Sequence, residues 1–330
     1  MFRLIGRTIS TLAIVATAQF FAASGQAQTN QAQNWPQRPV LLVLPFGPGS
    51  GADIAARLLS DKLQKLWGQP VIVEGRPGGD GLISVRGVVN AKDDHIIFFG
   101  PTSAYVVHPY VHDNLGYDPE RDLQPIAGVA KVQVALAVSK SLGVANLKEL
   151  VGYAKSHPDK LSYGVAPGFS EFVFNGFLLE SDVRMVKVPY RDITQSPPDL
   201  GLSRIQLVMM SYAAMRAQEQ VGDIKVLAMA DTKRSAIAPD IPSAVEAGFP
   251  GLVASPVLGL MGHRDMPLDV RKKAAAGVLE ALKDEAVIGG LSRSGQPASP
   301  MGVEEFAAAV KDQHRQVAHI AQLLNIEKKK

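Results

Sequence analysis

Residues 39–67 combine a buried-strand pattern, a glycine-rich turn and an amphipathic helix. Residues 39–46 (PVLLVLPF) form a nearly continuous apolar run, which is typical of a strand buried on both faces of a sheet. The turn 47–51 (GPGSG) ends this run, and residues 53–67 follow with helical spacing. One face of that predicted helix carries Ile54, Leu58, Leu59, Leu63 and Leu66. We expect Ser50 and Asp53 to form a capping box at its start. A chain built this way is constrained to an α/β fold.

The same alternation of strand-like and helical segments continues along the chain. Further strands are expected at residues 70–74, 95–99, 124–138 (one or two strands), 160–165, 183–190, 203–210 and 225–230. Further helices are expected at residues 146–156, 169–181 and 303–325. Strands that alternate with helices predict mainly parallel sheets.

The amino terminus has the layout of a secretory signal peptide. Arg3 and Arg7 precede an apolar run over residues 11–23, and small residues end at Ala27. A transmembrane anchor is the alternative, but the run is shorter than the roughly 20 residues that cross a bilayer, and Gln19 interrupts it. We therefore expect cleavage after Ala27 and a periplasmic protein.

Chain length predicts more than one domain. About 300 residues after cleavage exceed one comfortable hydrophobic core. A chain that leaves its first domain near residues 125–131 and returns near 250–256 makes both domains discontinuous. The predicted division is a signal peptide at 1–27, domain 1 at 28–128 and again at 254–302, domain 2 at 129–253, and a C-terminal helix across both domains at 303–330.

Composition excludes several classes of function. The chain has no cysteine, which excludes disulfides, thiolate metal sites, a cysteine nucleophile and a lipid on cysteine. A net charge of +3, without a basic stripe, argues against binding to nucleic acid.

Two candidate motifs for metal binding and catalysis are incomplete. His108 and His112 are spaced as a helical metal pair, but Pro109 lies between them and no third ligand is near in the sequence. Residues 168–172 begin like the nucleophile elbow of a serine hydrolase but lack its closing glycine, which argues against that class of enzyme.

The glycine-rich turn at residues 46–53 has the form of an anion site. Free backbone amides and the positive end of the helix dipole meet where a strand, a glycine turn and a helix start follow each other. A dinucleotide site is one interpretation, with Glu74 in the place of the ribose-binding acid, although the glycine spacing departs from that fingerprint. Capture of a carboxylate by the backbone amides is the second interpretation. A simple tight turn without a bound anion is the third.

A series of motifs resembles a known family. They are Trp35-Pro36, Arg38-Pro39, Pro45-Phe46 through Gly49, residues 52–57 (ADIAAR), 68–74 (GQPVIVE), 76–78 (RPG), Gly100, Pro109, 117–119 (YDP), 188–190 (VPY), 233–235 (KRS), 239–243 (PDIPS) and 246–248 (EAG). In this order and spacing they are similar to the extracytoplasmic receptors of tripartite tricarboxylate transporters, the Bug family of periplasmic binding proteins.

The resemblance implies a type II periplasmic-binding-protein (Venus-flytrap) architecture, in which two α/β domains close around a ligand. It implies no catalysis and no cofactor. The partners that the resemblance implies are a small organic acid and integral membrane transporter subunits. We expect the protein to be a monomer. The site residues carried over are Phe46, Pro48, Gly49, Ser50, Asp53, Thr102, Ser103, Ala104, Phe169, Ser170, Tyr190, Arg191 and Gln206. A binding module that presents solute to a membrane sensor is the alternative function.

Departures from the family pattern fall in the predicted second domain. Val165, Ala166 and Pro167 stand where small polar residues are expected, and Val173 stands where the family has a histidine. Gln206 stands where a strand aspartate is expected, and Arg191-Asp192 replaces a lysine-glycine-like pair. A cleft lined by Phe169, Val165 and Val173 favours a ligand with an apolar or aromatic body, because unpartnered polar groups cost about 1–3 kcal/mol each when buried.

Overall fold

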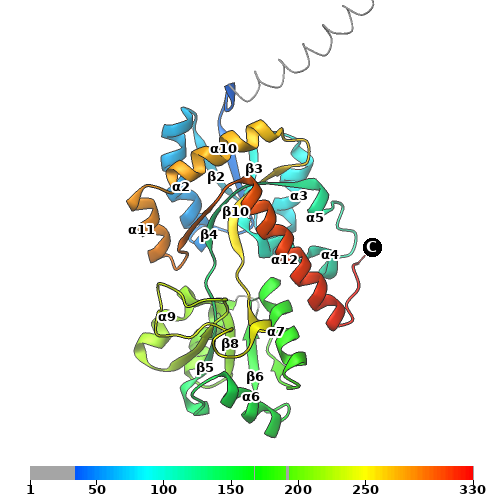
Figure 1. Cartoon of the computed structure of the whole chain (residues 1–330), viewed down its shortest axis with the longest axis vertical. Coiled ribbons are helices and arrows are strands. Elements are labelled where there is room, and N and C mark those ends of the chain that lie inside the picture. Colours follow the sequence, from blue (N-terminus) through cyan, green and yellow to red (C-terminus); the bar gives the residue numbers. More distant parts are fainter. Residues whose placement is uncertain (1–33, 167, 191–192, 330) are drawn as a thin grey trace, which may run out of the picture.

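The computed structural model describes residues 34–166, 168–190 and 193–329. The predicted signal peptide and Arg191 lie outside these residues. Within them the chain builds two mixed β-sheets, each covered by helices, which lie one above the other in Figure 1. The α/β prediction is confirmed.

The upper sheet in Figure 1 has the strand order β11-β4-β10-β3-β1-β2. Its strands are β1 (Val40–Leu44), β2 (Val71–Gly75), β3 (Ile96–Pro101), β4 (Leu123–Lys131), β10 (Val257–His263) and β11 (Ala298–Met301). β1 is parallel to β2 and β3, whereas β10 is antiparallel to β3 and β4, and β11 is antiparallel to β4.

The lower sheet has the order β7-β6-β8-β5-β9. Its strands are β5 (Val134–Ser139), β6 (Ser162–Val165), β7 (Val186–Lys187), β8 (Leu207–Ser211) and β9 (Ile224–Met229). β6 is parallel to β7 and β8, and β5 is antiparallel to β8 and β9. The expectation of mainly parallel sheets is therefore wrong. β4 runs toward the other sheet and β10 returns from it, so these two neighbours must be antiparallel.

Helices cover both faces of each sheet. They are α2 (Gly51–Trp67), α3 (Leu82–Ala91), α4 (His108–Val111), α5 (Pro119–Asp122), α6 (Leu147–Ser156), α7 (Phe169–Glu180), α8 (Ser196–Gly201), α9 (Tyr212–Val221), α10 (Leu268–Ala281), α11 (Glu285–Arg293) and α12 (Val303–Leu323). Short 3₁₀ turns occupy Gly79–Gly81, Thr102–Ala104, Lys140–Leu142, Ile193–Gln195 and Pro250–Leu252. The helices predicted at 53–67, 146–156, 169–181 and 303–325 are confirmed as α2, α6, α7 and α12.

Three hydrophobic cores follow from this layering. One core joins α2, α10 and α11 to the first sheet, and another joins α8 and α9 to the second sheet. The largest core contains buried side chains from both sheets together with α3, α7 and α12. The two halves of the molecule therefore share one continuous apolar cluster.

The chain passes between the sheets twice. It leaves β4 at Lys131 and enters β5 at Val134, and it returns between β9 and β10. Hydrogen bonds tie the two passages together: the Val132 amide donates to the Pro256 carbonyl (2.9 Å), and the Ala254 amide donates to the Ala230 carbonyl (2.8 Å). This pairing makes the connection a short ribbon of paired backbone.

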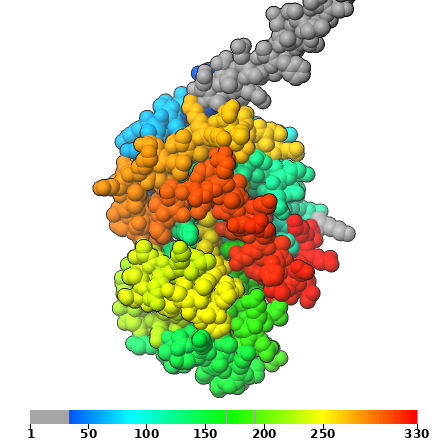
Figure 2. Space-filling model, viewed as in Figure 1, coloured from blue at the N-terminus to red at the C-terminus, as the bar shows by residue number. Residues whose placement is uncertain are grey.

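The last long helix contacts both halves of the molecule. Figure 2 shows α12, in red, lying along one side of the molecule across the level where the two halves meet. Its Gln313 and Gln316 side chains donate to the carbonyls of Ser255 (3.1 Å) and Val253 (2.7 Å) on the return passage. Ile320 packs at Gly176 of α7, where an added Cβ would lie 3.3 Å from the Ile320 side chain. α12 thus braces the passage and the second half together.

Among residues 34–166, 168–190 and 193–329, no helix has the length and apolar character that crossing a bilayer requires.

Replacing Ile320 with alanine tests the bracing by α12. Ile320 is 5% exposed, and we expect Ile320→Ala to lower the free energy of unfolding by about 2–5 kcal/mol. The control Ile83→Ala makes the same change in α3 at a side chain that is 55% exposed, and it should cost about 0.5 kcal/mol or less. Urea unfolding measures both. Equal losses would contradict the bracing role.

Candidate ligand-binding site

The loop after β1 is held in shape by Asp53. Its carboxylate accepts a hydrogen bond from the Gly49 amide (2.9 Å), and the Asp53 amide donates to the Ser50 hydroxyl (3.2 Å). The predicted capping box is therefore half correct, because the carboxylate takes the Gly49 amide in place of the Ser50 amide. Gly49 has a φ of +82°, which favours glycine.

Arg57 completes this arrangement one helical turn later. Its Nε lies 3.1 Å from both Asp53 carboxylate oxygens. The hydrogen bond from Arg57 keeps the pKa of Asp53 below its ordinary value of 3.8, although burial opposes the shift. With its oxygens engaged by Gly49 and Arg57, Asp53 shapes the loop. Its role as a ligand contact stays a prediction.

Two backbone amides remain open at the start of α2. The Gly51 and Ala52 amides have no hydrogen-bond acceptor among the residues that the structure describes. They lie at the positive end of a 17-residue helix, where an anion is stabilised. The Gln296 side chain packs against this point, since a Cβ added to Gly51 would lie 2.5 Å from Gln296 Nε2. The helix start therefore offers donors to an anion without a cationic side chain.

The loop after β3 lies beside the first loop. Gly81 brings the two together, because an added Cβ there would lie 3.1 Å from the Ala104 carbonyl oxygen and 3.2 Å from Pro45 Cβ. Ala104 is buried, and Ser103 is partly exposed. Ser103 is thus the accessible hydroxyl of this loop.

Thr102 has a structural role that the sequence did not indicate. Its hydroxyl donates to Gln313 Oε1 and accepts a hydrogen bond from the Val257 amide (3.1 Å), and the residue is completely buried. Both hydrogen-bonding capacities that a hydroxyl commonly uses are occupied. The prediction that Thr102 contacts the ligand is not supported by this geometry.

The second half of the molecule faces these loops with the start of α7. An added Cβ at Gly168 would lie 3.3 Å from the Ser103 carbonyl oxygen, so the two segments are in close approach. Ser170 is 6% exposed in the first turn of α7. Ser103 and the α7 start therefore meet across the junction.

The apolar side chains predicted to line the cleft are core residues. Phe169 and Val173 are completely buried, and Val165 is 6% exposed. All three belong to the large cluster that α7 shares with α12. Phe169 and Val173 lie on the α7 face that also contains Gly176, where Ile320 of α12 packs, so their apolar character serves packing in this structure. Their place in a ligand cleft stays a prediction.

Tyr190 and Gln206 are held by contacts within the second half, and the Tyr190 ring packs on Gly164 of β6. Tyr190 donates its hydroxyl to Asp199 (3.0 Å), and burial, followed by this bond, raises its pKa to about 12. Gln206 precedes β8 at its amino end, and its side-chain oxygen accepts from the Ser162 amide (2.9 Å) and hydroxyl (3.0 Å). β8 ends toward the junction at Ser211, so Gln206 lies at the wrong end to contact a ligand there.

The structure brings together a subset of the predicted site. Phe46, Pro48 and Gly49 are exposed on the first loop, Ser50 caps α2, and Ser103 meets the start of α7. Sequence analysis missed Gln296 and Gln313, which are distant in sequence from the loops they contact. Gln313 interrupts the buried apolar face of α12. This polar residue in an apolar pattern was the one feature of the sequence that could have indicated its buried hydrogen bonds.

Two α/β halves joined by paired passages, with close approaches at Gly168 and Gly295, have the architecture of a periplasmic-type solute-binding protein. Residues 55–326 match the family described as "Tripartite tricarboxylate transporter family receptor", and the chain belongs to this family. The family is one of receptors, so the protein is not an enzyme.

Solved structures with the same fold support this assignment. Rpa4515 with adipate, from R. palustris, is 26% identical with a TM-score of 0.77, covering 89% of this chain and 99% of its own. MatC from Rhodopseudomonas palustris with bound malate is 25% identical with a TM-score of 0.73, covering 87% and 99%. The periplasmic binding protein BugD is 26% identical with a TM-score of 0.74, covering 89% and 100%.

Two substitutions separate the structural hydroxyl from the accessible one. Thr102→Val leaves the Val257 amide and Gln313 without their partner, so we expect a loss of about 1–3 kcal/mol per unpaired group. Ser103→Ala should leave the unfolding free energy nearly unchanged and weaken ligand binding. Urea unfolding measures the loss of unfolding free energy in each variant. Equilibrium titration with a carboxylic acid that the wild type binds measures the change in ligand affinity. Stability loss in Ser103→Ala with none in Thr102→Val would reverse the assignment.

The Asp53 carboxylate predicts a pH-dependent stability. Its depressed pKa means that the ion pair stabilises the fold above pH 3.8 and that this contribution is lost as the pH falls through the lower folded-state pKa. We expect Asp53→Asn to be less stable than the wild type at pH 7, with a difference that shrinks as the pH falls below 3.8 and disappears below the lower folded-state pKa of Asp53. Asp312→Asn, which breaks an exposed pair with Arg315, is the control and should have little effect at either pH.

Proposed function

We propose that this protein is a periplasmic receptor that captures a small carboxylate-bearing ligand and delivers it to integral membrane transporter subunits. The observation that carries the proposal is the pair of open amides, Gly51 and Ala52, at the start of α2. A carboxylate oxygen bound there would satisfy donors that the described residues leave unpaired, and it would interact with the helix dipole. Adipate and malate, bound to two similar proteins, are ligands of this chemistry.

Closure of the two halves completes the proposed mechanism. The first half offers the α2 start and Ser103, and Ser103 already approaches Gly168 of the second half. The proposed domains are residues 28–128 with 254–302, and residues 129–253, and the change of sheet between Lys131 and Val134 supports this division. A ligand that contacts both halves favours the closed state only by its extra interaction with that state. We propose a monomer that works after removal of residues 1–27.

An apolar body distinguishes the proposed ligand from a compact dicarboxylate. Ala166, the residue directly after β6, is partly exposed beside the start of α7 and offers no side-chain hydrogen bond. The Phe46 ring is 41% exposed on the first loop and gives an apolar surface to a ligand. A second polar end buried here would lack a partner, which costs about 1–3 kcal/mol. We therefore expect a preference for longer aliphatic or aromatic acids.

Thermal unfolding of residues 28–330 with a panel of acids tests this function. The panel contains malate, citrate, adipate, benzoate and glutamate. A ligand at 100 times its dissociation constant adds about 2.7 kcal/mol of stability, which raises Tm by several degrees. We expect adipate or benzoate to give the largest shift. A larger shift with malate would contradict the apolar preference, and no shift with any acid would contradict carboxylate capture by this site.

A glycine pair supplies the matched control. Gly51→Ala places a Cβ against Gln296 at the open amides, so we expect it to reduce the ligand-induced shift. Gly152→Ala makes the same change in α6, where an added Cβ meets nothing within 4 Å, and the shift should persist. Equal shifts in the two variants would place the ligand elsewhere.

A further inference from the structure

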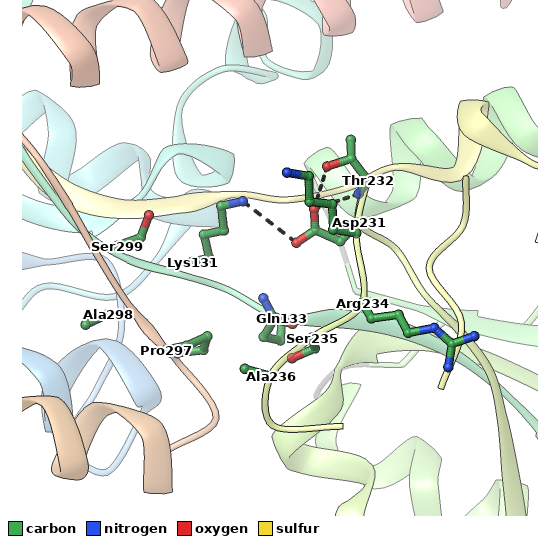
Figure 3. Close-up of a pocket in the computed structure, with 11 residues that line it drawn as sticks. Lys131, Gln133, Asp231, Thr232, Arg234, Ser235, Ala236, Pro297, Ala298 and Ser299 are labelled. Carbon is green, nitrogen blue, oxygen red and sulfur yellow. Dashed lines mark hydrogen bonds and ion pairs between the residues drawn. The ribbon is translucent and has the colours of Figure 1, made fainter. Parts of the chain in front are cut away.

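A separate cavity lies beside the paired passages between the sheets. Its volume is about 470 Å³, and none of the predicted ligand-binding residues lines it. Figure 3 shows its walls: Lys131 and Gln133 on the first passage, residues 231–236 after β9, and residues 297–299 at β11. The walls thus come from both halves of the molecule.

Lys131 brings a positive charge to this cavity with no hydrogen bond to neutralise it. Its Nζ lies 3.9 Å from the Asp231 carboxylate, which is beyond hydrogen-bonding distance. The other oxygen of that carboxylate, Oδ1, accepts from the Thr232 amide (2.6 Å) and hydroxyl (3.3 Å), while Oδ2 faces Lys131 as an ion-pair partner. An ammonium has three donors, so Lys131 keeps its capacity to bind an acceptor in the cavity.

Gln133 places an unsatisfied acceptor at the same position. The residue is 5% exposed, and its side-chain oxygen has no hydrogen-bond partner among the residues that the structure describes. A buried polar group without a partner is costly and uncommon in folded proteins. A ligand that donates a hydrogen bond to this oxygen, for example from a hydroxyl group, would remove the cost.

The backbone holds these two side chains in fixed positions. The Lys131 amide donates to the Pro297 carbonyl (3.1 Å), and the Gln133 carbonyl accepts from the Tyr212 amide (2.8 Å). One residue is thereby attached to β11 of the first sheet and the other to the start of α9 beside the second sheet. A change in the angle between the halves would alter the distances across the cavity.

The charge balance of the walls selects an anion. Lys131, Lys233 and Arg234 contribute three positive charges, and Asp231 contributes one negative charge. Arg234 is paired with Glu246 at 3.0 Å and points away from the cavity in Figure 3. Lys131 and Lys233 therefore outweigh Asp231.

We propose that this cavity is a second binding site, for a small hydroxycarboxylic acid whose carboxylate binds the Lys131 ammonium and whose hydroxyl donates to the Gln133 side-chain oxygen. Ser235 and Ser299 line the same cavity and supply hydroxyl groups near the ligand. Because the walls belong to both halves, an occupant stabilises the angle at which they fit it. The second site has a lining distinct from the residues of the proposed transport site.

A dye at the cavity rim tests the proposal directly. The chain has no cysteine, so Ala236→Cys, at an exposed position, can be labelled uniquely with an environment-sensitive fluorophore. Acetate, malate, adipate and citrate are titrated at constant ionic strength. We expect a saturable fluorescence change with malate or citrate, which carry a hydroxyl, and weaker binding of acetate and adipate, which do not. No saturable change with malate or citrate would overturn the proposal.

Substitutions then assign the signal to the cavity. Lys131→Gln should weaken the affinity about tenfold or more, because it removes a charge-assisted hydrogen bond, and Gln133→Leu should weaken it as well. Lys311→Gln makes the same charge change on the exposed face of α12 and should leave the affinity unchanged. An affinity that Lys131→Gln does not alter would mean that the dye reports closure around the other site, and the proposal would be wrong.

The two sites can fail separately. Ser103→Ala in the labelled protein removes a hydroxyl of the proposed transport site, and Ser103 is not among the residues that line the cavity, so the titration should be unchanged. A titration lost in Ser103→Ala would show that the dye reports the transport site and would overturn the cavity proposal. An acid bound at either site stabilises the fold, so a thermal shift that Lys131→Gln abolishes, together with a retained titration in the protein that carries Lys131, would reject the proposed transport site and leave the cavity proposal intact.

Discussion

The buried Thr102 hydroxyl is the interaction on which the geometry of the junction depends. It connects the loop after β3, the first residue of β10 and Gln313 of α12, which are far apart in sequence. Because a completely buried hydroxyl is costly when unpaired, moving any of the three segments apart would leave a polar group without its partner. Ser103 follows Thr102 directly, and its carbonyl oxygen lies at the close approach to Gly168 of the second half.

The two anion sites would work by different physical means. At the start of α2 the donors are backbone amides and the helix dipole, while the nearest cation, Arg57, is already paired with Asp53. In the cavity beside the passages the attraction comes from the Lys131 ammonium, which remains without a hydrogen-bonded counter-ion. A backbone site selects by shape and direction, whereas a lysine site is a point charge that tolerates several anions. This contrast suits a selective transport site beside a less selective second site.

Local sequence patterns predicted the elements well and their long-range relations poorly. The apolar run before residue 47, the glycine turn and the helix after it were all placed from spacing, and β1 and α2 follow. Strand direction was not predictable, because an apolar run has the same appearance in parallel and antiparallel neighbours. Phe169 and Val173 were assigned to the cleft for a related reason: helical spacing reveals an apolar face but not whether α12 covers it. Gln296 carries no local signal at all, since its partner Gly51 is more than 200 residues away.

Residues 295–297 connect the two proposed sites. Gln296 packs at Gly51 beside the open amides, the neighbouring Pro297 lines the cavity, and an added Cβ at Gly295 would lie 2.3 Å from Ala213 Cβ of α9. Gly295 also has a φ of +72°, so this tight contact with the second half requires glycine. A movement of the two halves must therefore shift this segment against both sites at once. Any coupling between them is then reciprocal: an anion in the cavity would change the affinity for the transport ligand by the same factor as the ligand changes the affinity of the cavity.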